Sequence, residues 1–209
     1  MLEYKKLNKF SGYTAFIIAL IVYSITVEDT ASFWDAGEFI AVSSKLEVPH
    51  PPGAPFYLLL GRFFSMFAFG VPENIAIAIN FLSVVSSALT ILFLFWTITY
   101  LISKVIDPKL NFNNKLLVIL SGFIGSLSFT FTDSFWFSAV ESEVYAMSSF
   151  FTAFVFWAIL KWESLESEVD QNKWIILIAY MMGLSIGVHL LNLVTIPALS
   201  LIIYFKKYN

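Results

Sequence analysis

Long apolar runs alternate with short polar connections along most of this sequence. A helix needs about 20 largely apolar residues to cross a bilayer, and four windows are long enough. A fifth apolar block, residues 174–205, is too long for one span, and Gly183, Gly187, His189 and Asn192 near its middle favour two short helices joined by a polar turn. The pattern therefore predicts six spans, at about residues 10–27, 75–101, 115–132, 143–161, 174–188 and 190–205.

The longest connection between the predicted spans is residues 28–74. Its first part, "SFWDAGEFIAVSSKL", has the periodicity of a short amphipathic helix. Four prolines between residues 49 and 55 then end any helix, because each fixes φ and lacks an N–H. Residues 56–69 form a second apolar segment, too short to span and better suited to the membrane interface. We expect two interfacial helices in this loop.

The positions of the lysines predict the orientation of the bundle. Short cytoplasmic loops are enriched in Lys and Arg. With six spans, the lysines that flank them fall on one side, among them Lys5, Lys104, Lys161 and Lys206. The N-terminus is then cytoplasmic, and the loop 28–74, a short turn at 133–142 and the turn near His189 lie on the extracytoplasmic side.

Composition supports a membrane protein and excludes several functions. Of the 209 residues, 58% are hydrophobic, 18% aromatic and only 13% charged, which is typical of a membrane bundle. A net charge of −3 with no basic stripe argues against nucleic acid as a partner. The chain has no cysteine, so disulfides, thiolate metal sites and Cys nucleophiles are excluded. The fold class expected is an all-α polytopic membrane bundle, treated as a single transmembrane domain.

Two carboxylates in the first loop, Asp35 and Glu38, are the strongest catalytic candidates. Their i, i+3 spacing places both on one face of a helix. Close carboxylates in a partly desolvated site repel each other, which raises the pKa of the pair and favours one as a proton acceptor near neutral pH. The same pair could hold a hard divalent cation through oxygen ligands. The structural alternative is that they cap a helix or solvate the loop.

His50 and Arg62, in the same loop, are candidates for substrate binding. The Pro-rich turn "VPHPPG" holds His50 stiffly, which suits phosphate binding or proton relay, although a surface role is the alternative. Arg62 lies on the apolar segment 56–69, where an uncompensated guanidinium is costly and needs a partner. A loop carboxylate in a structural pair, or the phosphate of a lipid substrate bound bidentately, would serve.

Acidic and aromatic residues gather at the ends of the third and fourth predicted spans. Asp133 follows the third span, and "AVESEVYAM" places Glu141, Glu143 and Tyr145 near the start of the fourth. The i, i+4 spacing predicts that Glu141 and Tyr145 face the same way and that Glu143 points elsewhere. Acids at a helix N-terminus also stabilise it by roughly 0.3–1 kcal/mol, which is the structural alternative. We expect all four to bind substrate.

His189 and Asn192 interrupt the last apolar block at membrane depth. Polar residues inside a membrane are usually functional. We therefore expect both to bind substrate, with a helix-turn role as the alternative for Asn192.

Three segments carry a resemblance to a known family. "DTASFWDAGEFIAVSSKLEVPHPPGAPFYLLLGRFF", "AVESEVYAM" and "GLSIGVHLLNLVTIPAL" occur in this order. They resemble the membrane domain of a family of bacterial multi-pass proteins of formerly unknown function, which is related to the eukaryotic transmembrane protein 260, a protein O-mannosyltransferase. That family is similar to membrane glycosyltransferases of the C superfamily, which have a large first extracytoplasmic loop with interfacial helices and an acidic catalytic motif.

The resemblance implies an inverting transfer of a sugar from a polyprenyl-phosphate donor to an extracytoplasmic acceptor. Mannose is one candidate sugar, and the acceptor is a protein or a glycan, with protein Ser or Thr as one candidate. It makes Asp35 the catalytic residue with Glu38 beside it. The residues that it places along the donor and acceptor cleft are His50, Arg62, Glu141, Glu143 and His189. Related enzymes differ in their need for a metal, so a divalent cation stays an open cofactor.

The resemblance further implies a bacterial inner-membrane protein, in contact with membrane lipid, of which this chain is expected to be the N-terminal part. Two other classes of function stay open on the residues alone. A transporter or lipid flippase would use the acids and His189 to bind a proton or solute, although transporter sites usually lie at the middle of the bilayer. A non-catalytic membrane scaffold would leave the carboxylates dispersed and solvated.

Overall fold

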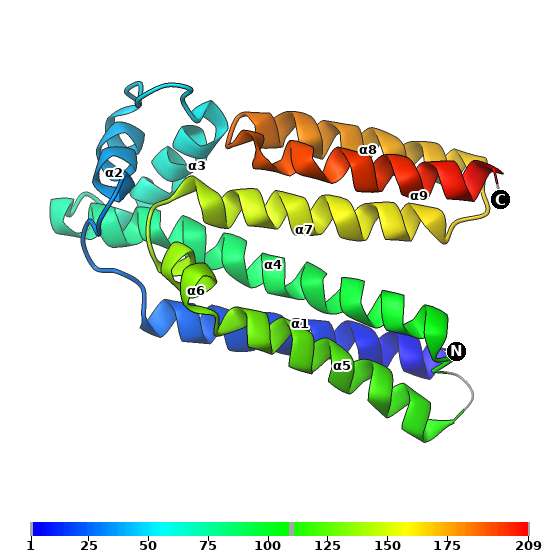
Figure 1. The fold of residues 1–209 in the computed structure, drawn as a ribbon. Coiled ribbons are helices and arrows are strands. Elements are labelled where there is room, and N and C mark those ends of the chain that lie inside the picture. The colour runs from blue at the N-terminus through cyan, green and yellow to red at the C-terminus, as the bar shows by residue number, and fades with distance from the viewer. Residues whose placement is uncertain (1, 109–110, 209) are drawn as a thin grey trace.

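The computed structural model describes residues 2–108 and 111–208, which fold into helices and their connections. Six long helices run along the bundle in alternating directions (Figure 1). They are α1 (Leu2–Ile25), α4 (Ile75–Val105), α5 (Phe112–Thr130), α7 (Val144–Glu163), α8 (Glu168–Ile186) and α9 (Ile196–Tyr208). The expected all-α bundle is confirmed.

Short helices gather at one end of the bundle. They are α2 (Ala36–Lys45), α3 (Pro55–Ser65) and α6 (Asp133–Val140), with single 3₁₀ turns at Met66–Ala68, Pro72–Asn74 and Leu190–Thr195. We call this the α2–α3 end. Both termini lie at the opposite end, which we call the terminal end (Figure 1). The prediction that residues 133–142 form a turn is wrong. Most of this connection forms α6, in which Phe135 and Ala139 face the core one helical turn apart.

Helix α4 is the centre of the fold. It packs on α1 and α5 along one side and on α7 along the other (Figure 1). Its buried positions include many small polar residues, such as Ser83, Ser87 and Thr90, which let neighbouring helices approach closely. Gly12 on α1 acts in the same way, since a Cβ there would lie 2.3 Å from Trp96 Nε1. Three apolar clusters result, on the α1–α5 side of α4, on the α2–α3 side, and between α7, α8 and α9.

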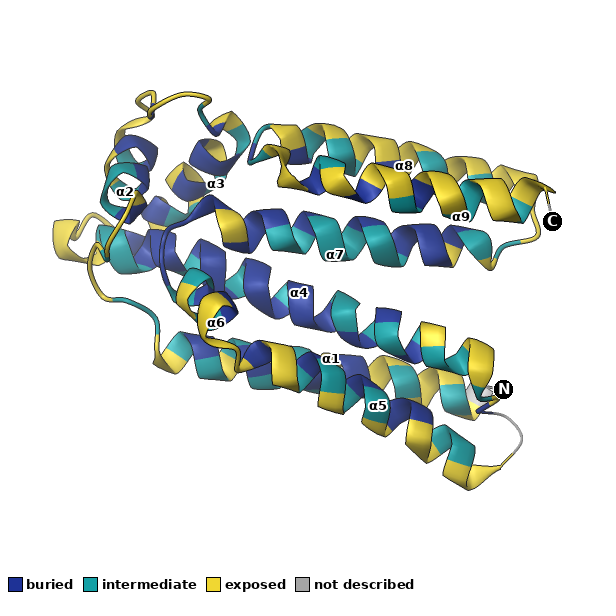
Figure 2. Ribbon diagram, in the orientation of Figure 1, coloured by how far each residue is buried: buried dark blue, intermediate teal, exposed yellow. Residues whose placement is uncertain are grey.

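The outer faces of the bundle are apolar. Much of α8, α9, α1 and α5 is exposed (yellow in Figure 2), and the exposed residues include Ile21, Ile124 and Leu201. A soluble monomer rarely exposes so much contiguous apolar surface, whereas a lipid-facing bundle must.

Five helical segments of the described chain are long and apolar enough to cross a membrane: Glu3–Ile25, Pro72–Val105, Phe112–Thr130, Val144–Glu163 and Leu190–Tyr208. Helix α8 has the length but is not among them, because its first two turns, which include the polar run from Asp170 to Lys173, lower its mean hydropathy. A sixth crossing by α8, and with it the predicted set of spans, stays a prediction.

Candidate functional site

The first wall of the site is the start of α2. Asp35 is the N-cap residue of this helix, but its side chain makes no capping hydrogen bond, so the carboxylate is left facing the loop. At the other end of α2, Leu46 adopts φ 55°, a left-handed conformation that stops the helix and turns the chain back. The Pro-rich segment that follows brings His50 over the first turns of α2.

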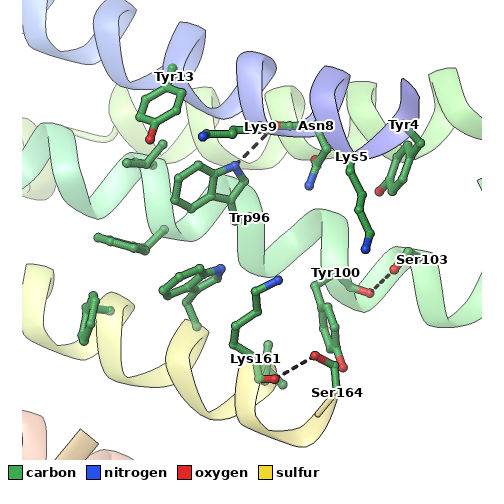
Figure 3. A pocket seen from close by; sticks show the side chains of 15 residues that line it. Tyr4, Lys5, Asn8, Lys9, Tyr13, Trp96, Tyr100, Ser103, Lys161 and Ser164 are labelled. Atoms are coloured by element: carbon green, nitrogen blue, oxygen red, sulfur yellow. Dashed lines mark hydrogen bonds between the residues drawn. The ribbon is translucent and has the colours of Figure 1, made fainter. Parts of the chain in front are cut away.

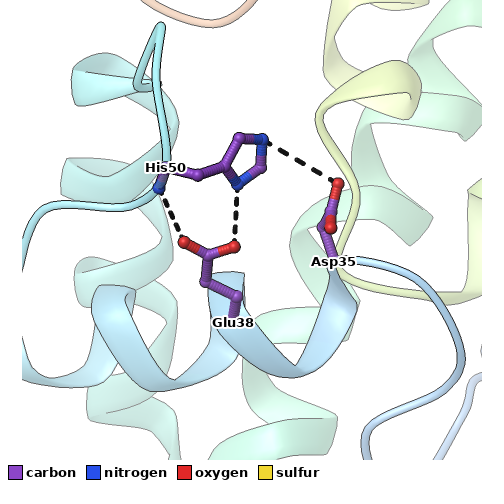
Figure 4. Close-up of side chains that lie close together, drawn as sticks. All are labelled: Asp35, Glu38 and His50. Atoms are coloured by element: carbon purple, nitrogen blue, oxygen red, sulfur yellow. Dashed lines mark hydrogen bonds and ion pairs between the residues drawn. The ribbon is translucent and has the colours of Figure 1, made fainter.

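Glu38 and His50 form a tightly held pair (Figure 4). The His50 backbone N–H donates to Glu38 Oε1 at 2.7 Å, and the ring Nδ1 lies 2.8 Å from Glu38 Oε2. The other ring nitrogen, Nε2, faces Asp35 Oδ2 at 4.0 Å. Hydrogen bonding to Glu38 raises the pKa of His50, and the two hydrogen bonds from His50 lower the pKa of Glu38. Glu38 thus fixes the ring, and both Asp35 and Nε2 stay accessible.

Two further carboxylates come from the extended segment between α6 and α7. Glu141 and Glu143 are both buried, with 2% and 4% exposure. Glu143 Oε1 accepts the backbone N–H of Asp35 at 3.2 Å, and Glu141 accepts the hydroxyl of Ser32. Burial raises the pKa of Glu143 to about 7, and repulsion from Glu141 and Asp35 adds to the rise. Burial also raises the pKa of Glu141. Glu143 therefore exchanges a proton near neutral pH.

The expected orientation of these residues is wrong. Helix α7 begins only at Val144, and Glu141 and Glu143 have extended backbone, so helical i, i+4 spacing does not apply. Glu143, rather than Glu141, lines a cavity together with Tyr145.

The cavity, of about 90 Å³, lies between α2, the Pro-rich loop, the start of α7 and the turn after α8. Five of the predicted residues line it: Asp35, His50, Glu143, Tyr145 and His189. The His189 and Tyr145 rings lie 5.6 Å apart. His189 Nδ1 accepts the Leu191 N–H at 3.1 Å, so the neutral ring carries its proton on Nε2. The cavity is therefore lined by both proton donors and proton acceptors.

The remaining predicted residues lie elsewhere or act indirectly. Glu38 does not line the cavity but holds His50, which does, and Glu141 does not line the cavity although its neighbour Glu143 does. Asp133 is the exposed first residue of α6. Asn192 is fully buried and donates to Ser185 Oγ at 2.9 Å. The structure does not bring these side chains to the cavity lining.

Arg62 contacts backbone and hydroxyl oxygens instead of the loop carboxylate that was one of its two expected partners. Its Nη1 donates to the backbone carbonyl of Ser44 at 2.5 Å and approaches Ser65 Oγ at 3.5 Å. Ser44 is in the last turn of α2, where carbonyls lack helical partners and favour a cation. Arg62 thus ties α3 to the end of α2, and neither a loop carboxylate nor the cavity is in contact with it.

Sequence reasoning missed Asn80, which organises the site from α4. This fully buried residue donates from Nδ2 to the carbonyls of Glu28 at 2.6 Å and Thr30 at 3.1 Å, while its Oδ1 accepts the hydroxyl of Ser142. It joins the segment before α2 to the segment before α7. A single Asn early in an otherwise apolar span was the available signal.

One set of side chains could hold a metal ion. Asp35, Glu38 and His50 each offer a ligand atom, and these atoms lie within 4.8 Å of one another. Carboxylate oxygens with one imidazole suit a divalent cation. Glu38 would have to share its His50-bound oxygen with such an ion.

The fold and the site define a class: a multi-pass helical membrane protein with a histidine–carboxylate cavity at one end. The chain belongs to the family described as the Protein O-mannosyl-transferase TMEM260 N-terminal domain, whose sequence profile matches residues 35–209.

Two relatives extend the comparison. The chain is 32% identical over 141 residues to the protein O-mannosyl-transferase tmem260 of Dictyostelium discoideum, covering 66% of this chain and 15% of the relative. It is 24% identical over 166 residues to the protein O-mannosyl-transferase TMEM260 of Mus musculus, covering 79% and 21%. The chain thus spans less than a quarter of the length of either relative. Comparison with solved structures gives no significant match.

Proposed function

We propose that this chain is the part of a membrane glycosyltransferase that carries the catalytic carboxylate. The sugar, with mannose as the first candidate, moves from a polyprenyl-phosphate donor to an extracytoplasmic acceptor, with protein Ser or Thr as the first candidate. Family membership supports the class of reaction, because both relatives are named protein O-mannosyl-transferases.

The single observation that carries the proposal is the convergence at the cavity. Asp35, His50, Glu143 and His189 come from three separate stretches of the chain and line one space. Solvated scaffold carboxylates would not be expected to converge, and a mid-bilayer transporter site would not be expected at the loop end of the bundle. Groups with perturbed pKa values in a cavity are typical of catalytic sites.

In the proposed reaction Asp35 accepts the proton of the acceptor hydroxyl. The hydroxyl oxygen attacks the anomeric carbon, the bond from that carbon to the phosphate oxygen breaks, and the lipid phosphate leaves with the bonding electron pair. This single displacement inverts the anomeric configuration. The hydrogen bond to Glu38 raises the pKa of His50 and so favours the protonated ring, which offers positive charge to the leaving phosphate. If a divalent cation were instead bound by Asp35, Glu38 and a neutral His50, the ion would supply the positive charge in place of the protonated ring.

The size of the cavity limits what it can hold. About 90 Å³ is well below the roughly 300 Å³ at which pockets for drug-sized ligands begin. It has room for a hydroxyl or a phosphate oxygen but not for a whole sugar. We infer that the sugar ring lies at the mouth, beside the half-exposed ring of Tyr145.

The proposal is tested with Asp35→Asn. General-base catalysis contributes about 10²–10⁴-fold, so this variant should lose at least about 100-fold in mannose transfer from polyprenyl-phosphate mannose to a Ser/Thr peptide. Asp29→Asn, at an exposed position of the same loop, is the matched control and should keep the wild-type rate. Thermal unfolding in detergent verifies that both are folded. Wild-type transfer by Asp35→Asn would refute the role of Asp35.

Donor binding gives a second readout that does not need turnover. Glu38→Gln removes the charge that holds the His50 proton, so affinity for polyprenyl-phosphate mannose should fall about tenfold, whereas Glu47→Gln in the same loop should leave it unchanged. Unchanged affinity in Glu38→Gln would contradict a charged His50 at the donor phosphate.

A further inference from the structure

A second and larger cavity lies at the terminal end of the bundle, away from the site described above. It has a volume of about 910 Å³ and is walled by α1, α4 and α7 (Figure 3). Its size is in the upper part of the roughly 300–1,000 Å³ range of small-molecule sites. Lys5 and Lys9 of α1 and Lys161 of α7 line it.

The walls change from polar to apolar along each of the three helices. On α1 the lining includes Tyr4 and Lys5 at the terminal end and reaches Tyr13, which lies about 12 Å deeper than Lys5 at 1.5 Å per residue. On α7 it runs from Ser164 and Lys161 to Phe154, again toward the middle of the bundle. Helix α4, which runs the opposite way to α1, repeats this order from Ser103 through Tyr100 to Phe93 and Leu92. Three independent helices thus present a charged or polar rim and an apolar interior.

The rim has unbalanced positive charge. Within the described part of the chain no ion pair involves Lys5, Lys9 or Lys161, and all three are exposed. Two acids at this end of the bundle are already engaged: Glu163 pairs with Lys104, and Glu3 pairs with Lys115. An anion at the rim would therefore find three free ammonium groups.

The apolar interior is preformed by aromatic rings. Helix α1 holds Trp96 in place, because Trp96 Nε1 donates to the Asn8 carbonyl at 3.3 Å (Figure 3). Gly12, also on α1, leaves room for the Trp96 ring. The ring centroids of Trp157 and Trp96 lie 5.6 Å apart, and those of Phe93 and Trp157 lie 5.0 Å apart. A wall of this kind loses little freedom when a hydrocarbon chain packs on it.

We propose that this cavity binds an anionic glycerophospholipid of the surrounding bilayer. Its phosphate lies among Lys5, Lys9 and Lys161, and one acyl chain extends along Phe93, Trp96 and Trp157. The rim charge selects an anionic headgroup, and the polar-to-apolar order of the walls matches the headgroup-to-tail order of a lipid that enters from the end of the bundle. This site is separate from the proposed transferase cavity and does not depend on it.

The test measures quenching of tryptophan fluorescence by bromine on lipid acyl chains. The purified chain is placed in phosphatidylcholine vesicles that contain a minor fraction of either brominated phosphatidylglycerol or brominated phosphatidylcholine as the quencher. In a second series, unlabelled polyprenyl phosphate or unlabelled phosphatidylglycerol is added as the competitor. We expect brominated phosphatidylglycerol to quench at lower concentration than brominated phosphatidylcholine. The variant Lys5→Gln/Lys9→Gln/Lys161→Gln should lose this preference, by about fivefold per lysine and about 100-fold in all.

The matched control is Lys6→Gln/Lys173→Gln/Lys207→Gln, which removes the same charge from exposed lysines at the same end but outside the cavity. It should keep the preference for phosphatidylglycerol. The single variant Lys9→Gln gives a second measurement, with a loss of about fivefold. Equal quenching by the two brominated lipids, an equal loss in the control, or displacement by polyprenyl phosphate at lower concentration than by phosphatidylglycerol would each overturn the proposal.

Discussion

Glu143 shows how one side chain acquires its chemistry from its surroundings. Its carboxyl is buried at the start of α7, beside the carboxylates of Glu141 and Asp35, and the backbone N–H groups of Asp35 and Val144 compensate only part of the cost. Asp35 is distant from Glu143 in sequence, and the contribution of Glu141 depends on the non-helical backbone that joins the two residues. The acid is therefore poised for proton exchange by the fold as a whole.

The raised pKa has a definite effect on stability. Since the folded pKa, about 7, exceeds the ordinary value of 4.5, the folded state holds the Glu143 proton more tightly than the unfolded state does. This contribution is full below pH 4.5 and is lost as the pH rises to 7, with a total of roughly 3 kcal/mol. Glu143→Gln should remove that pH dependence and raise the melting temperature at pH 8.

The measurement is thermal unfolding in detergent from pH 4.5 to pH 8, with exposed Glu73→Gln as the control. A wild-type-like pH profile in Glu143→Gln would contradict the assignment.

At the scale of single residues, the proximity of Asp35, Glu38 and His50 could be predicted, because all three lie within 16 residues and the Pro-rich turn brings His50 back over α2. Arg62 could not be predicted in the same way. A guanidinium in an apolar segment needs a partner, but the sequence pattern does not distinguish a carboxylate from the end of a neighbouring helix. That choice depends on how α3 packs on α2.

The packing of α2 on α3 positions the Asp35 and Glu38 side chains. The two helices meet where Gly61 of α3 faces the fully buried Ser43 of α2. A Cβ at Gly61 would lie 2.8 Å from Ser43 Cβ, which is too close for either backbone to stay in place.

Gly61→Ala should therefore destabilise the chain by roughly 1–3 kcal/mol and shift α2 away from the cavity. Gly183→Ala is the matched control, because a Cβ at that helical glycine meets nothing within 4 Å and alanine is the better helix former. Melting temperatures in detergent compare the two variants. Equal stability of Gly61→Ala and the wild type would show that the contact between the two helices yields easily.

Elements were predicted best where the apolar pattern was long. The ends of α4 and α7 lie within four residues of the predicted limits, 75–101 and 143–161. Helix α1, predicted at 10–27, ends two residues early and starts eight residues early, at Leu2. Helix α6 was missed because eight residues contain too few repeats to separate a helix from a turn. The non-helical backbone of residues 141–143 was missed for the same reason, and that error reversed the orientation of Glu141 and Glu143.

For the molecule as a whole, the sequence predicted that distant polar residues would meet at one end, but it could not predict which of them would share a cavity. Alternation of long helices brings the first loop, the start of α7 and the turn after α8 to the same end (Figure 1). Which residues then line the space depends on rotation of each helix about its axis. Packing against the neighbouring helices sets that rotation, and a one-dimensional pattern does not contain it.

Membrane orientation and the crossing by α8 are testable with single cysteines, since the chain has none of its own. Cysteine at Glu47 should react with an impermeant reagent from the extracytoplasmic side, and cysteine at Glu166 only from the cytoplasmic side. If α8 crosses, cysteine at the exposed Leu190 should behave like that at Glu47. Reaction of positions 166 and 190 from the same side would leave five crossings.

The three hydrogen bonds of Asn80 give the two halves of the site a common reference point. The stretch that leads to Asp35 and the stretch that leads to Glu143 are each fastened to the same amide, deep in α4. One side chain therefore fixes the distance between these two segments, which would otherwise depend on the conformations of two independent loops. Sequence changes can alter the length or the exposed side chains of either loop, but the separation of Asp35 and Glu143 is preserved only as long as position 80 keeps an amide.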